Sequence, residues 1–117
     1  GGGSLSNNGS NSIDLIDPDG VSAVPGESIT LRASATFTTA NNGLSPKVEF
    51  FVDSVKVGEG TREGSTNNYT FSWDSTGVSL GSHSVTARSV TGTDTVVLVS
   101  DANTITLISN SATINQP

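Results

Sequence analysis

The sequence contains no cysteine, which excludes disulfide bonds and thiolate metal sites. It has five basic residues against eleven acidic ones, for a formal net charge of −6, and the basic residues are scattered along the chain. A nucleic-acid-binding protein needs a basic patch to neutralise phosphates, so the composition excludes that class of partner. No segment approaches the run of about 18 apolar residues that a membrane helix requires, so we expect no membrane insertion. The net negative charge favours a monomer, because identical copies repel one another.

The sequence also has a single histidine, a single tryptophan and a single tyrosine. A Ser-His-Asp triad needs a base that a third group orients, and no nucleophile context such as G-x-S-x-G surrounds any serine. Paired carboxylates can hydrolyse a glycosidic bond, but most acidic residues of this chain fall in turn sequences, where aspartate bonds to the backbone. We therefore expect that the protein is not an enzyme.

The composition and the pattern of the chain are typical of β-strands. Its 117 residues suit one domain, and threonine and valine, which pack well on a pleated surface, are abundant. Residues 27–37 alternate most regularly, with Ile29, Leu31, Ala33 and Ala35 on one face and polar residues on the other. No stretch of helical length repeats with a period of 3.6.

Further segments alternate in the same way and are separated by turn sequences such as Pro-Asp-Gly. They predict strands over residues 12–17, 46–53, 55–58, 69–73 and 83–90, and a broken final strand over 95–100 and 103–108. About seven short strands at this spacing predict an all-β fold, a Greek-key β-sandwich.

The two ends of the chain have a different composition. Residues 1–11 are nearly all glycine, serine and asparagine, which predicts a flexible linker or a leader added in cloning. Residues 110–117 have the same polar character and predict a C-terminal linker. The sandwich is therefore expected over residues 12–109, cut out of a longer chain.

The residues expected in the core share the inward face of their strands. They are Ile29, Leu31, Ala33, Val48, Phe50, Val52, Phe71, Trp73, Val85, Ala87, Ile105 and Leu107.

Two segments, PKVEFFVDSVKVGEG and NYTFSWDSTGVSLGSHSVTARSV, resemble the bacterial Ig-like domains that accompany catalytic domains in secreted polysaccharide-degrading enzymes and that occur in surface adhesins. The resemblance runs over about residues 13–108. It implies an immunoglobulin-like sandwich of about seven strands, and it implies that His83 begins a strand and hydrogen-bonds a neighbouring loop. The family is a reusable scaffold, so the resemblance implies the fold more than any ligand.

The sequence departs from this family after the strand that contains Arg88. A longer apolar element, Thr95 to Val99, stands where the family usually has a short turn. An extended valine-rich edge at this place would be either a liability or an interface.

Acidic residues gather around the first turn. Asp14, Asp17 and Asp19 follow one another at a strand-to-turn junction, and such alternating oxygen ligands suit calcium, with Asp94 and Asp101 as further donors from another loop. The spacing is not that of an EF-hand. The alternative interpretation is a turn in which the aspartates bond to the backbone around the intervening proline.

Two aromatic residues are candidates for stacking on a sugar ring. Phe51 has the outward parity of its strand, and either a loop, a neighbouring domain or a carbohydrate covers it. Tyr69 shares the inward parity of Phe71 and Trp73, which favours a place in the core.

We interpret the chain as a non-catalytic accessory or spacer module of a secreted or cell-surface multidomain bacterial protein, beside a carbohydrate-active enzyme. Its partner would be a neighbouring domain of the same chain, and it would need no cofactor unless calcium binds. Two alternatives stay open: a carbohydrate-binding module with a polysaccharide partner, and a cell-surface adhesion domain that binds protein through the edge at residues 96–99.

Overall fold

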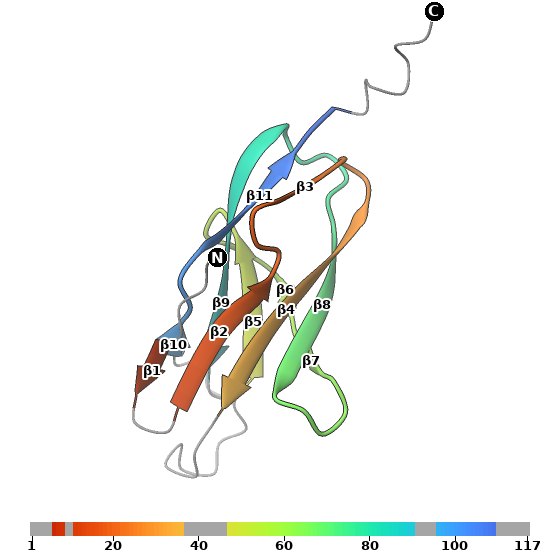
Figure 1. The fold of residues 1–117 in the computed structure, drawn as a ribbon. Coiled ribbons are helices and arrows are strands. Elements are labelled where there is room, and N and C mark those ends of the chain that lie inside the picture. The colour runs from red at the N-terminus through yellow and green to blue at the C-terminus, as the bar shows by residue number, and fades with distance from the viewer. Residues whose placement is uncertain (1–5, 9–10, 37–46, 91–95, 110–117) are drawn as a thin grey trace, which may run out of the picture.

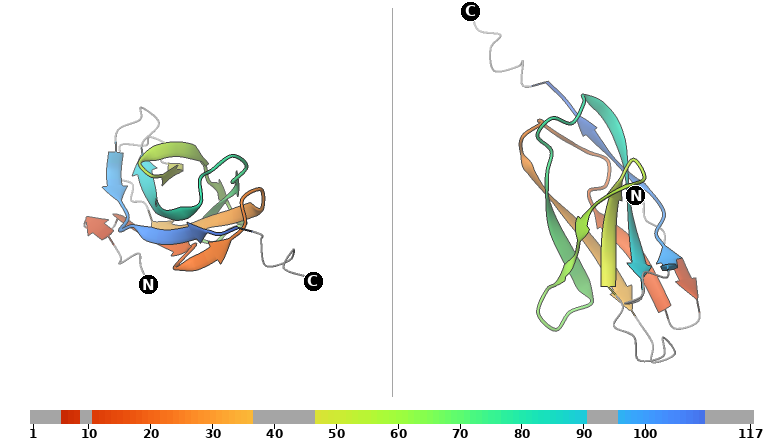
Figure 2. Two further views of the ribbon diagram at one scale, coloured as in Figure 1. Left: turned by 90° about the horizontal axis from the view of Figure 1, so that it is seen from above. Right: turned by 180° about the vertical axis from the view of Figure 1, so that it is seen from behind.

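The computed structural model describes residues 6–8, 11–36, 47–90 and 96–109, which form a sandwich of two β-sheets without any helix in this part of the chain (Figure 1). Nothing in the described residues is a helix long and apolar enough to cross a membrane. Seen from above, β5 and β6 lie on one side of the sandwich and β2 and β4 on the other (Figure 2).

The first sheet, sheet A, has five antiparallel strands. In spatial order they are β1 (Ser6–Asn8), β2 (Asn11–Asp17), β4 (Ser28–Thr36), β8 (Asn68–Asp74) and β7 (Thr61–Arg62).

The second sheet, sheet B, faces the first across the core. In spatial order it holds β3 (Val21–Ala23), β11 (Asn103–Leu107), β9 (Gly81–Val90), β5 (Lys47–Val52) and β6 (Val55–Glu59), and β10 (Val96–Val99) also pairs with β9. The chain crosses between the sheets from β4 to β5, from β6 to β7 and from β8 to β9, which confirms the Greek-key sandwich.

The predicted strands are confirmed in the described part of the chain, with ends that shift by one or two residues. The strand expected over residues 27–37 is β4, and the one expected over 46–53 is β5. The broken final strand is also confirmed, because β10 and β11 both pair antiparallel with β9. The break lies at Ser100, whose Oγ accepts the N–H of Ala87 at 2.9 Å in place of a backbone carbonyl.

The expectation of a flexible linker over residues 1–11 is wrong at residues 6–8 and at Asn11. Residues 6–8 form β1, which pairs with β2, and Asn11 begins β2. A short serine- and asparagine-rich strand has no hydrophobic alternation, so the sequence pattern could not reveal it. Residues 1–5, 9–10 and 110–117, the rest of the predicted linkers, lie outside the described residues, as do residues 37–46 and 91–95.

The core lies between the two sheets and contains eleven of the twelve expected residues, with Phe50, Leu31 and Val85 fully buried. Phe71 was expected there too, but it is only partly buried and packs against the core from β8. Its ring fills the space beside Gly58, where any added Cβ would come within 2.3 Å of it. Ile13 and Leu15 of β2 complete the core from sheet A.

Between β2 and β3 the chain passes from sheet A to sheet B through a short crossing, residues 18–20, which the buried side chain of Asn103 holds in place. Its Nδ2 donates to the carbonyls of Leu15 at 3.1 Å and Pro18 at 2.9 Å. The N–H of Gly20 then bonds to the carbonyl of Thr104 at 2.8 Å, and β3 begins its parallel pairing with β11. Asp17 precedes this crossing and Asp19 lies in it, so Asn103 also fixes the backbone beside these two predicted calcium ligands.

Candidate functional site

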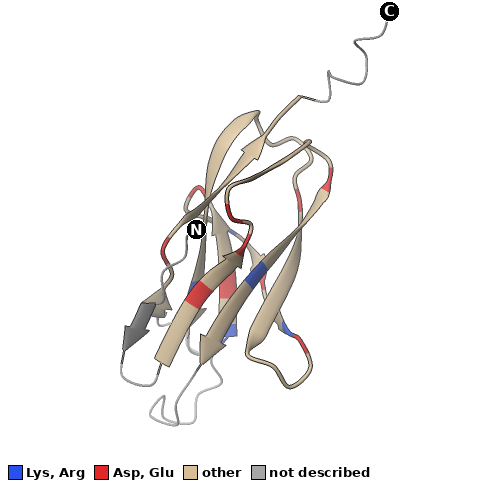
Figure 3. Ribbon diagram, in the orientation of Figure 1, with Lys and Arg blue, Asp and Glu red and all other residues tan. Residues whose placement is uncertain are grey.

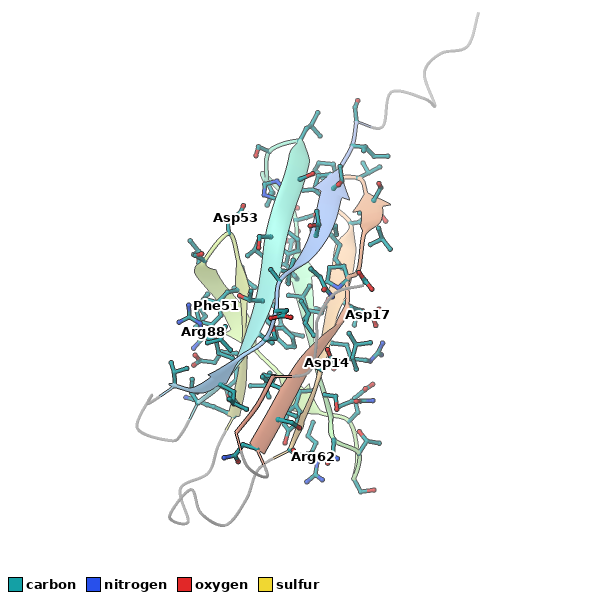
Figure 4. All side chains as sticks on the ribbon, turned by 60° about the vertical axis from the view of Figure 1, so that its left-hand side comes forward. Asp14, Asp17, Phe51, Asp53, Arg62 and Arg88 are labelled. Carbon is teal, nitrogen blue, oxygen red and sulfur yellow. The ribbon has the colours of Figure 1, made fainter. Side chains whose placement is uncertain are left out.

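Asp14 and Asp17, two of the three aspartates predicted to bind calcium, have different neighbours in the structure (Figure 4). The Nη1 of Arg32, on the neighbouring strand β4, donates to Oδ2 of Asp17 at 2.8 Å. The Nε of the same guanidinium donates to Glu63 at 3.2 Å. Asp17 is therefore engaged by a cation on the outer face of sheet A.

Asp14 lies instead among other acids. The pKa of its carboxyl is raised above the ordinary value, first by burial and then by the charges of Asp101 and Asp19. Its Oδ1 is buried and has no hydrogen-bond partner. Asp101 was named from the sequence as a further donor, and Asp94 lies outside the described residues.

Within the described part of the chain, no three histidine, cysteine, aspartate or glutamate side chains are arranged to hold a metal ion. The predicted ligand set is thus divided, with Asp17 beside Arg32 and Asp14 near Asp19 and Asp101. Calcium binding stays a prediction.

The predicted sugar-stacking residue Phe51 does point away from the core, as its parity indicated, because Phe50 and Val52 on either side of it belong to the core cluster. It is nevertheless only 8% exposed. The guanidinium carbon of Arg88, on the neighbouring strand β9, lies 4.1 Å from the centroid of its ring (Figure 4). The guanidinium of Arg88 thus stacks on the Phe51 ring and covers the face on which a sugar would stack.

Tyr69 does not join Phe51 in a binding surface. It lies on β8 of sheet A, is partly buried and packs against the core, as its inward parity predicted. Phe51 lies on the outer face of sheet B, so the core separates the two rings. The two residues therefore do not form one surface, and sugar binding at either of them stays a prediction.

His83, at the beginning of β9, joins three segments of the upper end of the sandwich. Its Nδ1 lies 2.5 Å from Oδ2 of Asp53, in the turn between β5 and β6, and its Nε2 lies 2.8 Å from the carbonyl oxygen of Ser79. The second oxygen of Asp53 accepts the N–H of Ser84 at 3.0 Å. The bond to Ser79 confirms the expectation that His83 binds a neighbouring loop.

Both partners of the His83 ring are acceptors, so the geometry favours the imidazolium, which donates from both nitrogens. The pKa of His83 is raised, first by the hydrogen bond to Asp53 and then by the carbonyl of Ser79. The pKa of Asp53 is lowered, first by the bond from His83 and then by the N–H of Ser84. With Nε2 directed at a carbonyl, the ring does not face a hydroxyl nucleophile.

Acidic and basic residues are interspersed over both sheets (Figure 3). Most of the cations are bonded to oxygen atoms nearby: Arg32 to Asp17 and Glu63, Lys47 to Glu59, Lys56 to Glu49, and Arg62 to the carbonyls of Ser65 and Thr66. Arg88 stacks on Phe51 instead. The sequence could not show this pairing, because cross-strand register decides which charges meet.

Two facing sheets with Greek-key connections and a first strand divided between them define the class of protein, an immunoglobulin-like β-sandwich module. The model of the family described as bacterial Ig domain matches residues 12–87, and the chain belongs to that family. No curated protein matches it.

Two solved structures share the fold. The fibronectin(III)-like modules of Clostridium thermocellum CbhA are 19% identical, with a TM-score of 0.63 over 92% of this chain and 50% of that one. The endo-beta-1,4-mannanase from Thermotoga petrophila is 17% identical, with a TM-score of 0.63 over 86% of this chain and 20% of that one. The chain thus spans about half of the first structure and a fifth of the second, and at these identities the likeness concerns the fold alone.

Proposed function

We propose that this chain is a non-catalytic accessory module of an exported, multidomain bacterial protein, in which it holds a carbohydrate-active neighbour in place. The observation that carries the proposal is that the residues best suited to chemistry are engaged by neighbours in the fold. His83 is held between Asp53 and Ser79, and Phe51 is covered by Arg88. Such contacts serve the rigidity that a spacer needs.

The two similar structures support the choice of neighbour. One belongs to a set of fibronectin(III)-like modules and the other to a mannanase, and each is a longer chain of which this module matches a part. Both likenesses support a partner domain in the same polypeptide. The likeness to a mannanase also supports export, because polysaccharides are degraded outside the cell.

Retention of the isolated chain on insoluble polysaccharides tests this proposal against the carbohydrate-binding alternative. We expect no retention on cellulose, mannan or xylan, with calcium or with a chelator. Specific retention on one polymer would overturn the spacer role. The same samples test the calcium prediction, because an ion that binds the folded state raises its melting temperature. Equal melting temperatures in calcium and in chelator would end that prediction.

A second candidate function, adhesion to a partner protein through residues 96–99, is favoured by one observation. The strand β10 pairs with β9 on one side, and no described strand pairs with its other side.

A further inference from the structure

The outer face of sheet B holds most of the basic residues of the chain. Alternate residues of β5 belong to the core, so Lys47, Glu49 and Phe51 lie on the outer face. Arg88 of β9 is opposite Glu49 in register and shares that face. Lys56 of β6 is opposite Phe51 and shares it too. Three of the five cations in the sequence therefore gather on the outer face of this sheet.

The strands β5, β6 and β9 contribute two acids to this face, and a lysine engages each of them. Nζ of Lys56 donates to Oε2 of Glu49 at 2.8 Å. Nζ of Lys47 lies 3.7 Å from Oε1 of Glu59, which is opposite Glu49 in register. The third cation, Arg88, has no acid left to it on these strands. Among the described residues, no oxygen atom bonds to its guanidinium.

Arg88 is nevertheless held in place on the sheet. Its guanidinium carbon lies 4.1 Å from the centroid of the Phe51 ring (Figure 4). Its Nε is buried without a hydrogen-bond partner, whereas the residue as a whole is partly exposed. A charged donor that lacks an acceptor costs free energy, and a planar guanidinium pairs best with a planar carboxylate. The fold thus presents a positioned cation to which a carboxylate from outside can bind.

The surroundings of Arg88 favour an acidic side chain of a protein over an acidic sugar. A sugar ring stacks on an aromatic face, and that of Phe51 is already covered by the guanidinium. Lys56 and Glu49, on the same face, are bonded to each other, which leaves fewer groups for the hydroxyls of a sugar. This face offers one unpaired charge, and such a contact suits the polar rim between two protein domains.

We propose that Arg88 is the docking point for an aspartate or glutamate on the domain that neighbours this module in the same polypeptide. The inference rests on the proposed accessory role and names the contact that serves it. The carboxylate accepts from the guanidinium of Arg88, and the Phe51 ring supports the guanidinium from behind. One such contact is weak between separate molecules, but a linker holds the neighbour at an effective concentration on the order of millimolar, so a weak contact suffices.

NMR spectra of the isotope-labelled chain test the site, because they report the Nε–Hε signal of each arginine. The sequence has three arginines, and Arg88→Lys identifies the signal of Arg88 by removing it. The probes are a short peptide that alternates serine with glutamate, the same peptide with lysine, and an oligomer of galacturonic acid. We expect the glutamate peptide to shift the Arg88 signal, more strongly at low salt, and the lysine peptide to leave it unmoved. Equal shifts with both peptides, or galacturonate binding at least about tenfold tighter than the glutamate peptide, would overturn the proposal.

Variants locate the contact on the molecule. Arg88→Gln should abolish the shifts of the β5 and β9 amides that the glutamate peptide causes, and Phe51→Leu should weaken binding severalfold because the guanidinium loses its support. Arg62→Gln removes the same charge from β7 of sheet A and should leave binding unchanged. A well-dispersed spectrum shows that each variant is folded. Binding that survives in Arg88→Gln would place the contact on the lysines instead and overturn the assignment.

The longer polypeptide that holds this module and its neighbour tests the source of the carboxylate. We expect the two domains to tumble together in NMR relaxation at low salt, and to tumble separately in Arg88→Gln but not in Arg62→Gln. Domains that already tumble separately in the wild type would overturn the docking contact. That failure would leave the polysaccharide result, and with it the accessory role, untouched. Retention on a polysaccharide that Arg88→Gln does not change would instead overturn the accessory role alone.

Discussion

His83 and Asp53 are joined by a hydrogen bond of 2.5 Å that ties the beginning of β9 to the turn after β5. The side chain of His83 is 9% exposed, whereas that of Asp53 is 52% exposed. Because a second bond joins His83 to Ser79, one imidazolium holds both the turn and the loop before β9.

Unfolding of the wild type and of His83→Gln should differ in a pH-dependent way. The pKa of His83 is raised in the folded state, so its contribution is fully present below its ordinary value of 6.5 and is lost as the pH rises through the folded pKa. The pKa of Asp53 is lowered, so its contribution is present above 3.8 and is lost as the pH falls through the folded pKa. Between pH 3.8 and 6.5 we expect the free energy of unfolding of the wild type to exceed that of His83→Gln by about 1–2 kcal/mol. The difference should be smaller at higher pH.

Urea unfolding across this range measures the difference, with Asp53→Asn as the matched partner variant. Since the sequence contains one histidine, its ring signals in NMR report its pKa without ambiguity. A histidine that titrates at or below 6.5, or a difference in stability that grows above neutral pH, would contradict the imidazolium.

Gly58→Ala should destabilise the domain through Phe71. An added Cβ at this position would come within 2.3 Å of the Phe71 ring, so the ring has to leave its place against the core. Overpacking of this kind costs about 1–3 kcal/mol. Chemical unfolding measures the loss, and Phe71→Leu should restore part of it by making room. Gly64→Ala is less suitable as a control because its backbone φ is +57°, whereas Ser65→Ala changes an exposed loop residue.

Trp73→Ala should cost about 3–5 kcal/mol, because it opens a cavity in the core. Trp73 is 6% exposed and lies opposite Ile29 in the register between β4 and β8. A domain of ordinary stability would be largely unfolded by this loss. Circular dichroism and thermal melting measure the effect, and an unchanged melting temperature would contradict the core assignment.

Strand parity could predict much of this architecture, but it could not predict which side chains meet between strands. The alternation of residues 28–36 gave both the strand β4 and its buried face. The same rule gave the outward direction of Phe51, yet its cover by Arg88 depends on the register between β5 and β9. Asp17 and Arg32 likewise meet through the register of β2 and β4, after a bulge that no pattern in the sequence marks.

Asp14→Asn should stabilise the domain at neutral pH. The raised pKa of Asp14 means that the folded state holds the carboxylate less favourably than the unfolded chain, because of burial and of the charges of Asp101 and Asp19. Stability therefore falls as the pH rises from the unfolded pKa through the folded one, and a neutral amide avoids this loss. Since water screens partly exposed charges, we expect a gain of at most about 1 kcal/mol.

Thermal melting of Asp14→Asn at neutral pH and near pH 3 measures this effect, and the gain should disappear at the lower pH, where both side chains are neutral. Glu59→Gln removes an equal charge elsewhere together with the ion pair to Lys47, so this control should not stabilise the domain. A loss of stability at neutral pH would mean that the carboxylate has a favourable partner, and a loss that appears only with calcium present would make that partner the ion.

Arg88 and Phe51 should show a measurable coupling in a double-mutant cycle. A guanidinium stacked on an aromatic ring contributes about 0.5–1 kcal/mol at a partly exposed site. Arg88→Ala and Phe51→Leu, singly and together, isolate this contribution in urea unfolding, and Arg88→Lys keeps the charge but loses the planar stack. Additive effects of the two substitutions would contradict the stacking.

Because Arg88→Ala also uncovers the Phe51 ring, this variant should expose an aromatic face that the wild type lacks. If it gains retention on a polysaccharide that does not retain the wild type, the cover by Arg88 is what separates a structural module of this fold from a sugar-binding one.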